Sequence, residues 1–188
     1  GAIERWDEGL DAWTATAEVH MELAEGARQR NRLRSAGEAY LRAAVSYHFS
    51  KFVWVLDPER NRRNTEAAVR AMYAAHELLD PRAERIEAPL QSSHAVVANL
   101  RRPADQRRPP LVVLIPGLDS TKEEFFAWES TFLRRGMATL SLDGPGQGET
   151  GLQLNIRPDY DVAVTAILDA IANRTDHDLD RIGAVGVS

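Results

Sequence analysis

The sequence contains no cysteine among its 188 residues. Disulfide bonds, thiolate metal sites and a cysteine nucleophile are therefore excluded. Aromatic residues make up only 7% of the chain, and the formal net charge of −5 leaves no excess of basic residues. Because binding of nucleic acid usually requires a basic face, we expect no nucleic acid among the partners.

Long apolar runs are also missing. The longest, such as Leu111–Ile115, have the length of a β-strand and fall far short of the roughly 18 residues of a membrane-spanning helix. The N-terminus lacks the basic-then-apolar pattern of a signal peptide. We therefore expect a cytoplasmic protein with no membrane partner. The content of 27% charged and 44% apolar residues is typical of a globular protein.

Proline is nearly absent from the first 80 residues, where it occurs only at Pro58. Apolar residues recur there at helical spacing, which predicts an all-helical, cap-like domain over residues 1–82. Asp57-Pro58 is predicted to end the second helix, and Asn64 to cap the third.

Aromatic residues gather on the predicted second helix around Tyr47 and His48. We predict that these two side chains contact a substrate. The alternative is that they belong to the core, which is the commoner role of a histidine or tyrosine at helical spacing.

From residue 83 onward, short apolar runs alternate with helical patterns. This alternation is typical of an α/β fold, in which helices cover both faces of a mostly parallel sheet. The predicted strands are Ile86–Leu90, Ala95–Leu100, Leu111–Ile115, Met137–Leu142 and Arg181–Gly186.

The sequence Gly186-Val187-Ser188 follows an apolar predicted strand. A serine two residues after a glycine, at the end of a buried parallel strand, is the first half of the G-x-S-x-G nucleophile elbow. The glycine is expected because a side chain would collide in so tight a turn. The alternative is a chain end that happens to be serine, because G-x-S alone is common.

Two further loops follow predicted strands. The loop 116–122 lies where an α/β-hydrolase supplies a backbone N–H to its oxyanion hole, and Leu118 is the candidate donor. The alternatives are a plain strand-to-helix turn and a phosphate-binding loop, but no glycine directly precedes Lys122 as the latter motif requires. In the loop Asp143–Glu149, glutamate stands where a dinucleotide-binding loop needs its last glycine.

Neither loop therefore predicts a nucleotide, and the five histidines lack metal-binding spacing, so we expect no cofactor and no metal. None of the histidines follows Ser188, where the chain order serine, acid, histidine would place the catalytic one.

Four motifs together resemble a known family. They are Gly117–Glu124, Arg135–Thr139, Asp143–Glu149 and Gly186–Ser188, in this order. Their pattern is similar to that of α/β-hydrolases related to 2,6-dihydroxypseudooxynicotine hydrolase, to FrsA-type esterases and to fungal pigment-pathway hydrolases that shorten polyketides. The N-terminal run Ala43–Phe49 also resembles the helical domain of this family, so the resemblance covers nearly the whole chain.

The resemblance implies a serine hydrolase whose members cleave a carbon–carbon bond beside an aryl ketone or act on esters. Ser188 corresponds to the nucleophile and Leu118 to the backbone oxyanion donor. The acid, the histidine and the N–H after the nucleophile have no counterpart, so we expect these residues to form the first half of a longer chain. A chain altered at the serine and a stable shortened domain are the alternatives.

We therefore predict a small-molecule carbonyl substrate that is cleaved through an acyl-enzyme, with the remainder of the same chain completing the site. Hydrolysis of a C–C bond in an aryl ketone or polyketide-like compound is preferred over carboxylester hydrolysis. A homodimer is compatible with the sequence. The alternative of another class is a non-catalytic binding module that retains the α/β-hydrolase fold.

Overall fold

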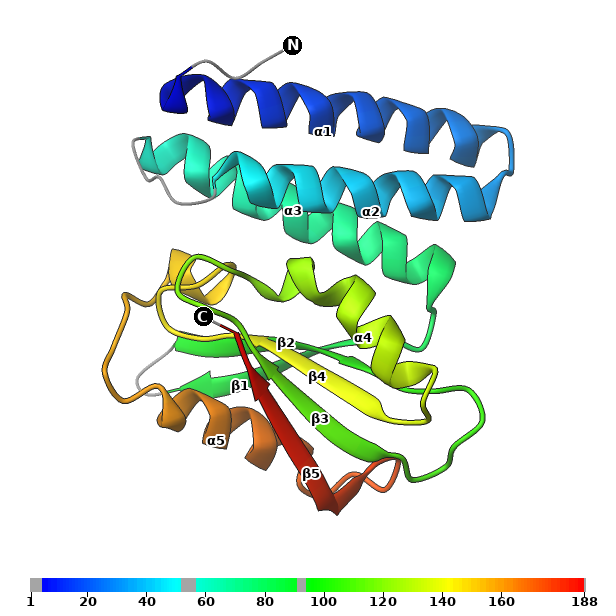
Figure 1. Cartoon of the computed structure of the whole chain (residues 1–188), viewed down its shortest axis with the longest axis vertical. Coiled ribbons are helices and arrows are strands. Elements are labelled where there is room, and N and C mark those ends of the chain that lie inside the picture. The colour runs from blue at the N-terminus through cyan, green and yellow to red at the C-terminus, as the bar shows by residue number, and fades with distance from the viewer. Residues whose placement is uncertain (1–4, 52–56, 91–93, 188) are drawn as a thin grey trace. The chain divides into compact units, whose positions relative to one another are not determined.

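The computed structural model describes residues 5–51, 57–90 and 94–187. The chain divides into two compact units, Gly1–Pro81 and Arg82–Ser188. Among the described residues, the first unit consists of the helices α1 (Trp6–Gln29), α2 (Leu33–Ser50) and α3 (Pro58–Leu79) (Figure 1). No helix in these described stretches is both long enough and apolar enough to cross a membrane.

The core of the first unit is made largely of alanine. Ala24 and Ala27 of α1 pack with Ala36 of α2 and Ala75 of α3 around the buried Tyr40. Because alanine side chains are small, the helices can approach closely. The Tyr40 hydroxyl donates a hydrogen bond to Glu25 and so links α2 to α1.

The beginning of α3 differs from the sequence prediction. Asp57 caps this helix by accepting hydrogen bonds from the N–H groups of Glu59 and Arg60, and Pro58 is its first residue. Asn64, the predicted cap, lies buried inside the helix and donates to Thr14 and Ser50 at 2.9 and 2.7 Å. Proline suits the first helical turn because the N–H that it lacks would have no partner there.

The described part of the second unit contains the strands β1 (Glu84–Leu90), β2 (His94–Arg101), β3 (Pro110–Ile115), β4 (Ala138–Asp143) and β5 (Asp178–Gly186). They form one mixed sheet in the order β1-β2-β4-β3-β5. The β1–β2 and β2–β4 pairs are antiparallel, whereas β4–β3 and β3–β5 are parallel. The parallel part is therefore the one that carries the predicted catalytic loops.

Helices cover both faces of this sheet, α5 (Asp161–Ile171) on one and α4 (Phe126–Leu133) on the other (Figure 1). On the α5 face, Ile167 and Ile171 pack against Leu140 and Leu142 in an apolar core. Short 3-10 helices precede α4 and follow β4, at Lys122–Phe125 (η1) and Thr150–Leu152 (η2).

The α4 face carries buried charges. Arg101 of β2 donates to Glu129 of α4 at 2.9 Å and to the Phe126 carbonyl at 3.1 Å. The Ser141 hydroxyl of β4 donates to the other oxygen of Glu129 at 2.6 Å. Because a buried ion pair requires good geometry and further hydrogen bonds, these contacts together fix the position of α4 on the sheet.

The strand before the predicted elbow is β5, and most of its residues are exposed in the described part of the chain. This strand lies at the edge of the described sheet, and Ile182 is 41% exposed. Among the described strands, only β3 pairs with it.

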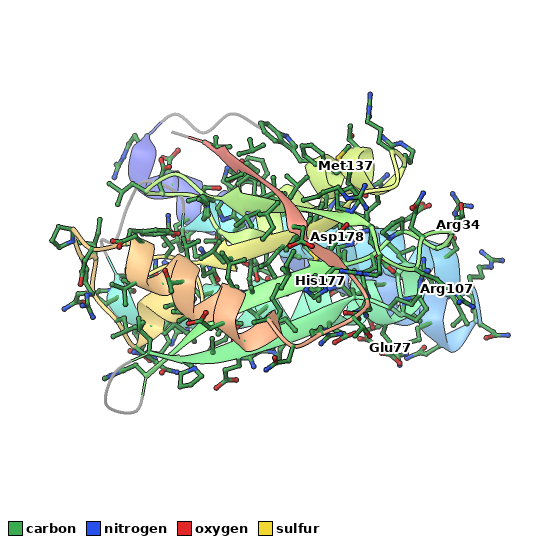
Figure 2. All side chains as sticks on the ribbon, turned by 90° about the horizontal axis from the view of Figure 1, so that it is seen from below. Arg34, Glu77, Arg107, Met137, His177 and Asp178 are labelled. Carbon is green, nitrogen blue, oxygen red and sulfur yellow. The ribbon has the colours of Figure 1, made fainter. Side chains whose placement is uncertain are left out.

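Ion pairs join the elements at the end of the sheet where β3, β4 and β5 begin. Arg174 contacts Glu84 of β1 at 2.9 Å and Asp176 at 2.7 Å, and Arg102 pairs with the same two carboxylates. His177, buried beside Asp176, precedes the first residue of β5, Asp178 (Figure 2). This network links β1, the end of β2 and the segment that enters β5.

Because of this network, we expect the free energy of unfolding to decrease as the pH falls into the acid range. Hydrogen bonds from Arg174 hold the pKa of Asp176 well below its usual range. Burial alone would raise the pKa of Glu84, but hydrogen bonds from Arg174 and Arg102 outweigh it and lower that pKa. A carboxyl group with a lowered folded-state pKa stabilises the fold above its unfolded pKa, and this contribution is lost as the pH falls through the folded pKa.

We therefore expect Arg174→Met to lower the melting temperature of the complete protein at pH 7 by more than at pH 3. Thermal unfolding followed by circular dichroism at both pH values checks this. The exposed Arg134→Met in the same unit serves as the control, since the Arg134 side chain, just after α4, donates to the Thr131 hydroxyl of that helix. If Arg174→Met lowers the melting temperature equally at pH 7 and pH 3, the ionised carboxylates paired with Arg174 do not cause the pH dependence.

Candidate active site

The three predicted loops meet at the carboxyl end of the parallel strands. Gly186, the last residue of β5, pairs with Ile115, the last residue of β3. The Val187 N–H then donates to the Ile115 carbonyl at 3.1 Å. Ser188 follows directly in sequence but lies outside the described residues, so its role as nucleophile stays a prediction.

The space around Gly186 is open in the described part of the chain. A Cβ built on Gly186 meets no atom within 4 Å. Among the described residues nothing crowds Gly186, so the collision expected in the elbow turn stays a prediction.

Leu118 lies on the loop that follows β3, and its side chain is 69% exposed. In the described part of the chain, no acceptor is bonded to the Leu118 N–H, as an oxyanion donor requires. A hollow of about 260 Å³ opens beside it. Its lining is mostly apolar and comprises Ile115, Pro116, Leu118, Pro145, Gln147, Ile156, Arg157 and Tyr160.

The glycine-rich loop after β4 encloses a buried carboxylate. Asp143 accepts hydrogen bonds from the N–H groups of Lys122 and Glu149 at 2.8 and 2.9 Å. A Cβ on Gly148 would come within 2.2 Å of the Asp143 carboxylate, so only glycine fits. Gly148 also has a φ of +42°, in the region that favours glycine. The loops after β3 and β4 are thus held together through Asp143.

Lys122 completes this cluster. Its buried ammonium lies 2.7 Å from Asp143, 2.7 Å from Glu123 and 3.2 Å from Glu149. Burial alone would raise the pKa of Asp143, but the charge and hydrogen bonds of Lys122 outweigh it and hold this pKa below its usual value. A lowered pKa keeps Asp143 ionised at neutral pH, which suits a structural counter-ion and not a proton donor.

The predicted substrate contacts lie in the first unit. His48 is fully buried in α2, with its ring edge-on to Phe49 at 5.0 Å, and Tyr47 beside it is half-buried. Burial, followed by the charge of Glu18, raises the pKa of Tyr47. Neither residue borders the hollow of about 300 Å³ that His20, Leu23 and Arg42 help to line in this unit. Their contact with substrate stays a prediction.

Sequence reasoning missed Lys122, Asp143 and Gln147 as site residues. Each is a polar residue that directly borders or lies within a loop already assigned to the site. Their position in or beside these loops could have indicated a role in the site. Their hydrogen-bond partners could not be predicted, because these lie far away in the sequence. Across residues 5–51, 57–90 and 94–187, no cluster of three or more His, Asp or Glu side chains could hold a metal ion.

A protein-family model described as Esterase FrsA-like matches residues 7–188. The 2,6-dihydropseudooxynicotine hydrolase of Paenarthrobacter nicotinovorans is 34% identical over 185 residues, which cover 95% of this chain and 48% of that protein. The 20-hydroxy-prefusarin hydrolase FUS2 of Gibberella moniliformis is 34% identical over 202 residues, covering 100% of this chain and 47% of that one. The chain thus spans about half the length of the curated relatives it matches.

Solved structures agree with these relatives. The crystal structure of 2,6-dihydroxy-pseudo-oxynicotine hydrolase superposes with a TM-score of 0.83 at 33% identity and covers 94% of this chain and 50% of that one. AbyA5 shares the fold, with a TM-score of 0.71 at 23% identity over 96% of this chain and 46% of that one. The resemblance predicted from the four motifs is confirmed. The chain has an α/β-hydrolase fold and belongs to the FrsA-like esterase family.

Proposed function

We propose that the complete protein is a serine hydrolase that cleaves a carbonyl compound through an acyl-enzyme. The observation that carries this proposal is the meeting of two loops. The end of β5 at Gly186-Val187, hydrogen-bonded to Ile115, lies beside the loop on which Leu118 presents an N–H without an acceptor in the described chain. An acyl-transfer site needs a nucleophile and an oxyanion donor on adjacent loops in this way.

The proposed reaction begins with attack of the Ser188 hydroxyl on the carbonyl carbon. A histidine from a segment after Ser188 takes the hydroxyl proton, as the chain order of α/β-hydrolases requires. The Leu118 N–H and the N–H of the residue after Ser188 stabilise the oxyanion of the tetrahedral intermediate. The leaving group departs with the electron pair and receives the proton from the histidine, which leaves the acyl group on Ser188. Water then hydrolyses this ester and releases a carboxylic acid.

For the substrate we propose an aryl ketone or a polyketide-like compound in which a C–C bond breaks. The leaving carbanion of such a compound is stabilised by a neighbouring carbonyl or ring, so its expulsion needs no metal. Two observations support this choice. The relatives include a pseudooxynicotine hydrolase and a prefusarin hydrolase, and the hollow beside Leu118 is mostly apolar.

A carboxylesterase is the second candidate, because the matching family model is described as an esterase. The same site would then expel an alkoxide. Comparing kcat/KM for an aryl β-diketone and for an ester of the same acyl group separates the two reactions. A higher value for the diketone supports C–C hydrolysis.

Labelling of the complete protein with a fluorophosphonate probe tests the proposal. Peptide mapping by mass spectrometry should find the label on Ser188 and not on Ser120, whose buried hydroxyl donates to Glu124. Absence of label at Ser188, together with tight binding of small carbonyl compounds, would overturn the proposal in favour of a non-catalytic binding module.

A further inference from the structure

Gln147 connects three parts of the candidate site. Its side-chain Nε2 donates to the carbonyl oxygens of Pro116 and Gly117 at 3.1 and 2.6 Å. Its Oε1 accepts from the Gly144 N–H at 2.9 Å and from the Tyr160 hydroxyl at 2.6 Å. A primary amide has two donor hydrogens and two acceptor lone pairs, so this buried side chain uses its full hydrogen-bonding capacity.

These partners determine which way the amide faces. The two carbonyl groups can only accept, and the Gly144 N–H can only donate. Rotating the amide by half a turn would place like groups against each other at three of the four contacts. Gln147 is therefore held in a single orientation.

The contact with Gly117 acts on the predicted oxyanion donor. The Gly117 carbonyl and the Leu118 N–H belong to the same planar trans peptide, in which C=O and N–H point in opposite directions. The carbonyl accepts from Gln147 and also from the Ser120 N–H at 3.1 Å. Fixing this oxygen fixes the plane of the peptide and directs the Leu118 N–H away from Gln147.

These hydrogen bonds also polarise the peptide. Donation to a carbonyl oxygen draws electron density from the peptide nitrogen, which strengthens the N–H at the other end as a donor. Gln147 thus affects both the direction of the Leu118 N–H and its strength toward a developing oxyanion.

Tyr160 supports Gln147 from the segment that leads into α5. Its ring lies so close to Gly144 that a Cβ there would come within 2.1 Å of it. Burial, followed by the negative charge of Asp143, raises the pKa of the Tyr160 hydroxyl. The hydroxyl therefore stays protonated around neutral pH and continues to donate to Gln147.

We propose that Gln147, held by Tyr160, is a positioning residue that orients and polarises the Gly117–Leu118 peptide for the oxyanion hole. The inference rests on the proposed function and deepens it, because the oxyanion exists only during acyl transfer. Gln147 touches the supporting peptide and acts through Leu118. Its removal should therefore slow the chemical step and leave ground-state binding unchanged.

The rate of fluorophosphonate labelling of Ser188 in the complete protein tests this proposal. Phosphonylation also develops charge on an oxygen, and it can be divided into a maximum rate and a half-saturating probe concentration. Gln147→Ala should lower the maximum rate about 10- to 100-fold, since misplacing a catalytic group by about 1 Å can cost 100-fold. The half-saturating concentration should stay within about twofold. Gln153→Ala, at an exposed position after the same loop, is the control and should label at the unaltered rate.

Gln147→Glu provides a pH readout that a merely structural role would not give. An ionised glutamate keeps the shape and both acceptor contacts, but it cannot donate to the carbonyl groups of Pro116 and Gly117. At pH 8, the maximum labelling rate of Gln147→Glu should therefore be as low as that of Gln147→Ala. Relative to the unaltered protein it should recover at lower pH, where the protonated acid donates one hydrogen bond.

Tyr160→Phe keeps the ring against Gly144 and removes only the hydroxyl. This variant therefore tests the proposal even if Gln147→Ala does not fold. We expect Tyr160→Phe to lower the maximum labelling rate by less than Gln147→Ala does. Adding Tyr160→Phe to Gln147→Ala should cause no further loss, because Tyr160 acts through Gln147. If Ser188 is labelled in the unaltered protein but the Gln147→Glu and Tyr160→Phe variants label at its maximum rate, the inference is overturned and the proposed function stands. If Ser188 is not labelled in the unaltered protein, the proposed function itself fails.

Discussion

Replacing Ser188 by alanine is expected to lower kcat of the complete protein by about 10⁴-fold or more, as for other serine nucleophiles. The melting temperature should change little, because the end of β5 is held by a backbone hydrogen bond from Val187 to Ile115, which the substitution of a side chain at position 188 leaves in place. Initial rates with an activated ester, compared with thermal unfolding of the same preparation, check this.

Ser130→Ala is the matched control. The Ser130 hydroxyl donates to the Phe126 carbonyl within α4, away from the loops of the candidate site, so kcat should be retained. A Ser188→Ala variant that keeps a tenth of the activity would contradict the assignment of Ser188 as nucleophile.

Replacing Lys122 by methionine is expected to lower the free energy of unfolding by about 3–5 kcal/mol, the usual cost of leaving a buried charge without its partner. The ammonium is buried 2.7 Å from Asp143 and 2.7 Å from Glu123, so its loss leaves carboxylates without a nearby cation. Urea unfolding of the complete protein measures this change.

Two further variants test whether the loss of stability in Lys122→Met comes from a buried carboxylate that has lost its cation. Arg134→Met removes an exposed cation of the same unit and should change stability little. Adding Asp143→Asn to Lys122→Met should restore part of the loss, because it removes the stranded charge. A loss below about 1 kcal/mol for Lys122→Met would show that the cluster does not carry a buried ion pair of the expected strength.

The parallel part of the sheet could be predicted from the sequence because each strand there is a short apolar run that ends at a glycine-containing loop. Leu111–Ile115 became β3 almost unchanged, and the strand predicted over Met137–Leu142 became β4. The same rule located the three loops of the candidate site, since the carboxyl ends of parallel strands meet at one edge.

Local signals with two meanings were harder to assign. Asp57-Pro58 can end one helix or begin the next, and the choice depends on whether the aspartate accepts from the following N–H groups. In the structure it does, so it begins α3. Asn64 has the composition of a cap, but its amide is used between helices, toward Thr14 and Ser50.

The hydrogen-bond networks of the site could not be predicted because they join residues far apart in the chain. Gln147 bonds to Pro116, and Asp143 bonds to Lys122. Nothing in the spacing of these residues specifies that their side chains meet, because this depends on how the loops after β3 and β4 fold back over the strands. Tyr47 and His48 illustrate the opposite case, since an aromatic cluster on a helix serves a core and a pocket equally well.

The close contacts of the glycine-rich loop restrict how this gene can vary. Every single-nucleotide change in a glycine codon that does not yield glycine or a stop introduces a residue with a Cβ atom. At Gly144 that atom would overlap the Tyr160 ring, and at Gly148 it would overlap the Asp143 carboxylate. Neither position can reach another amino acid in one step without displacing the side chain that packs against it. Gly144 can therefore be replaced between lineages only if Tyr160 changes with it, and Gly148 only if Asp143 changes with it.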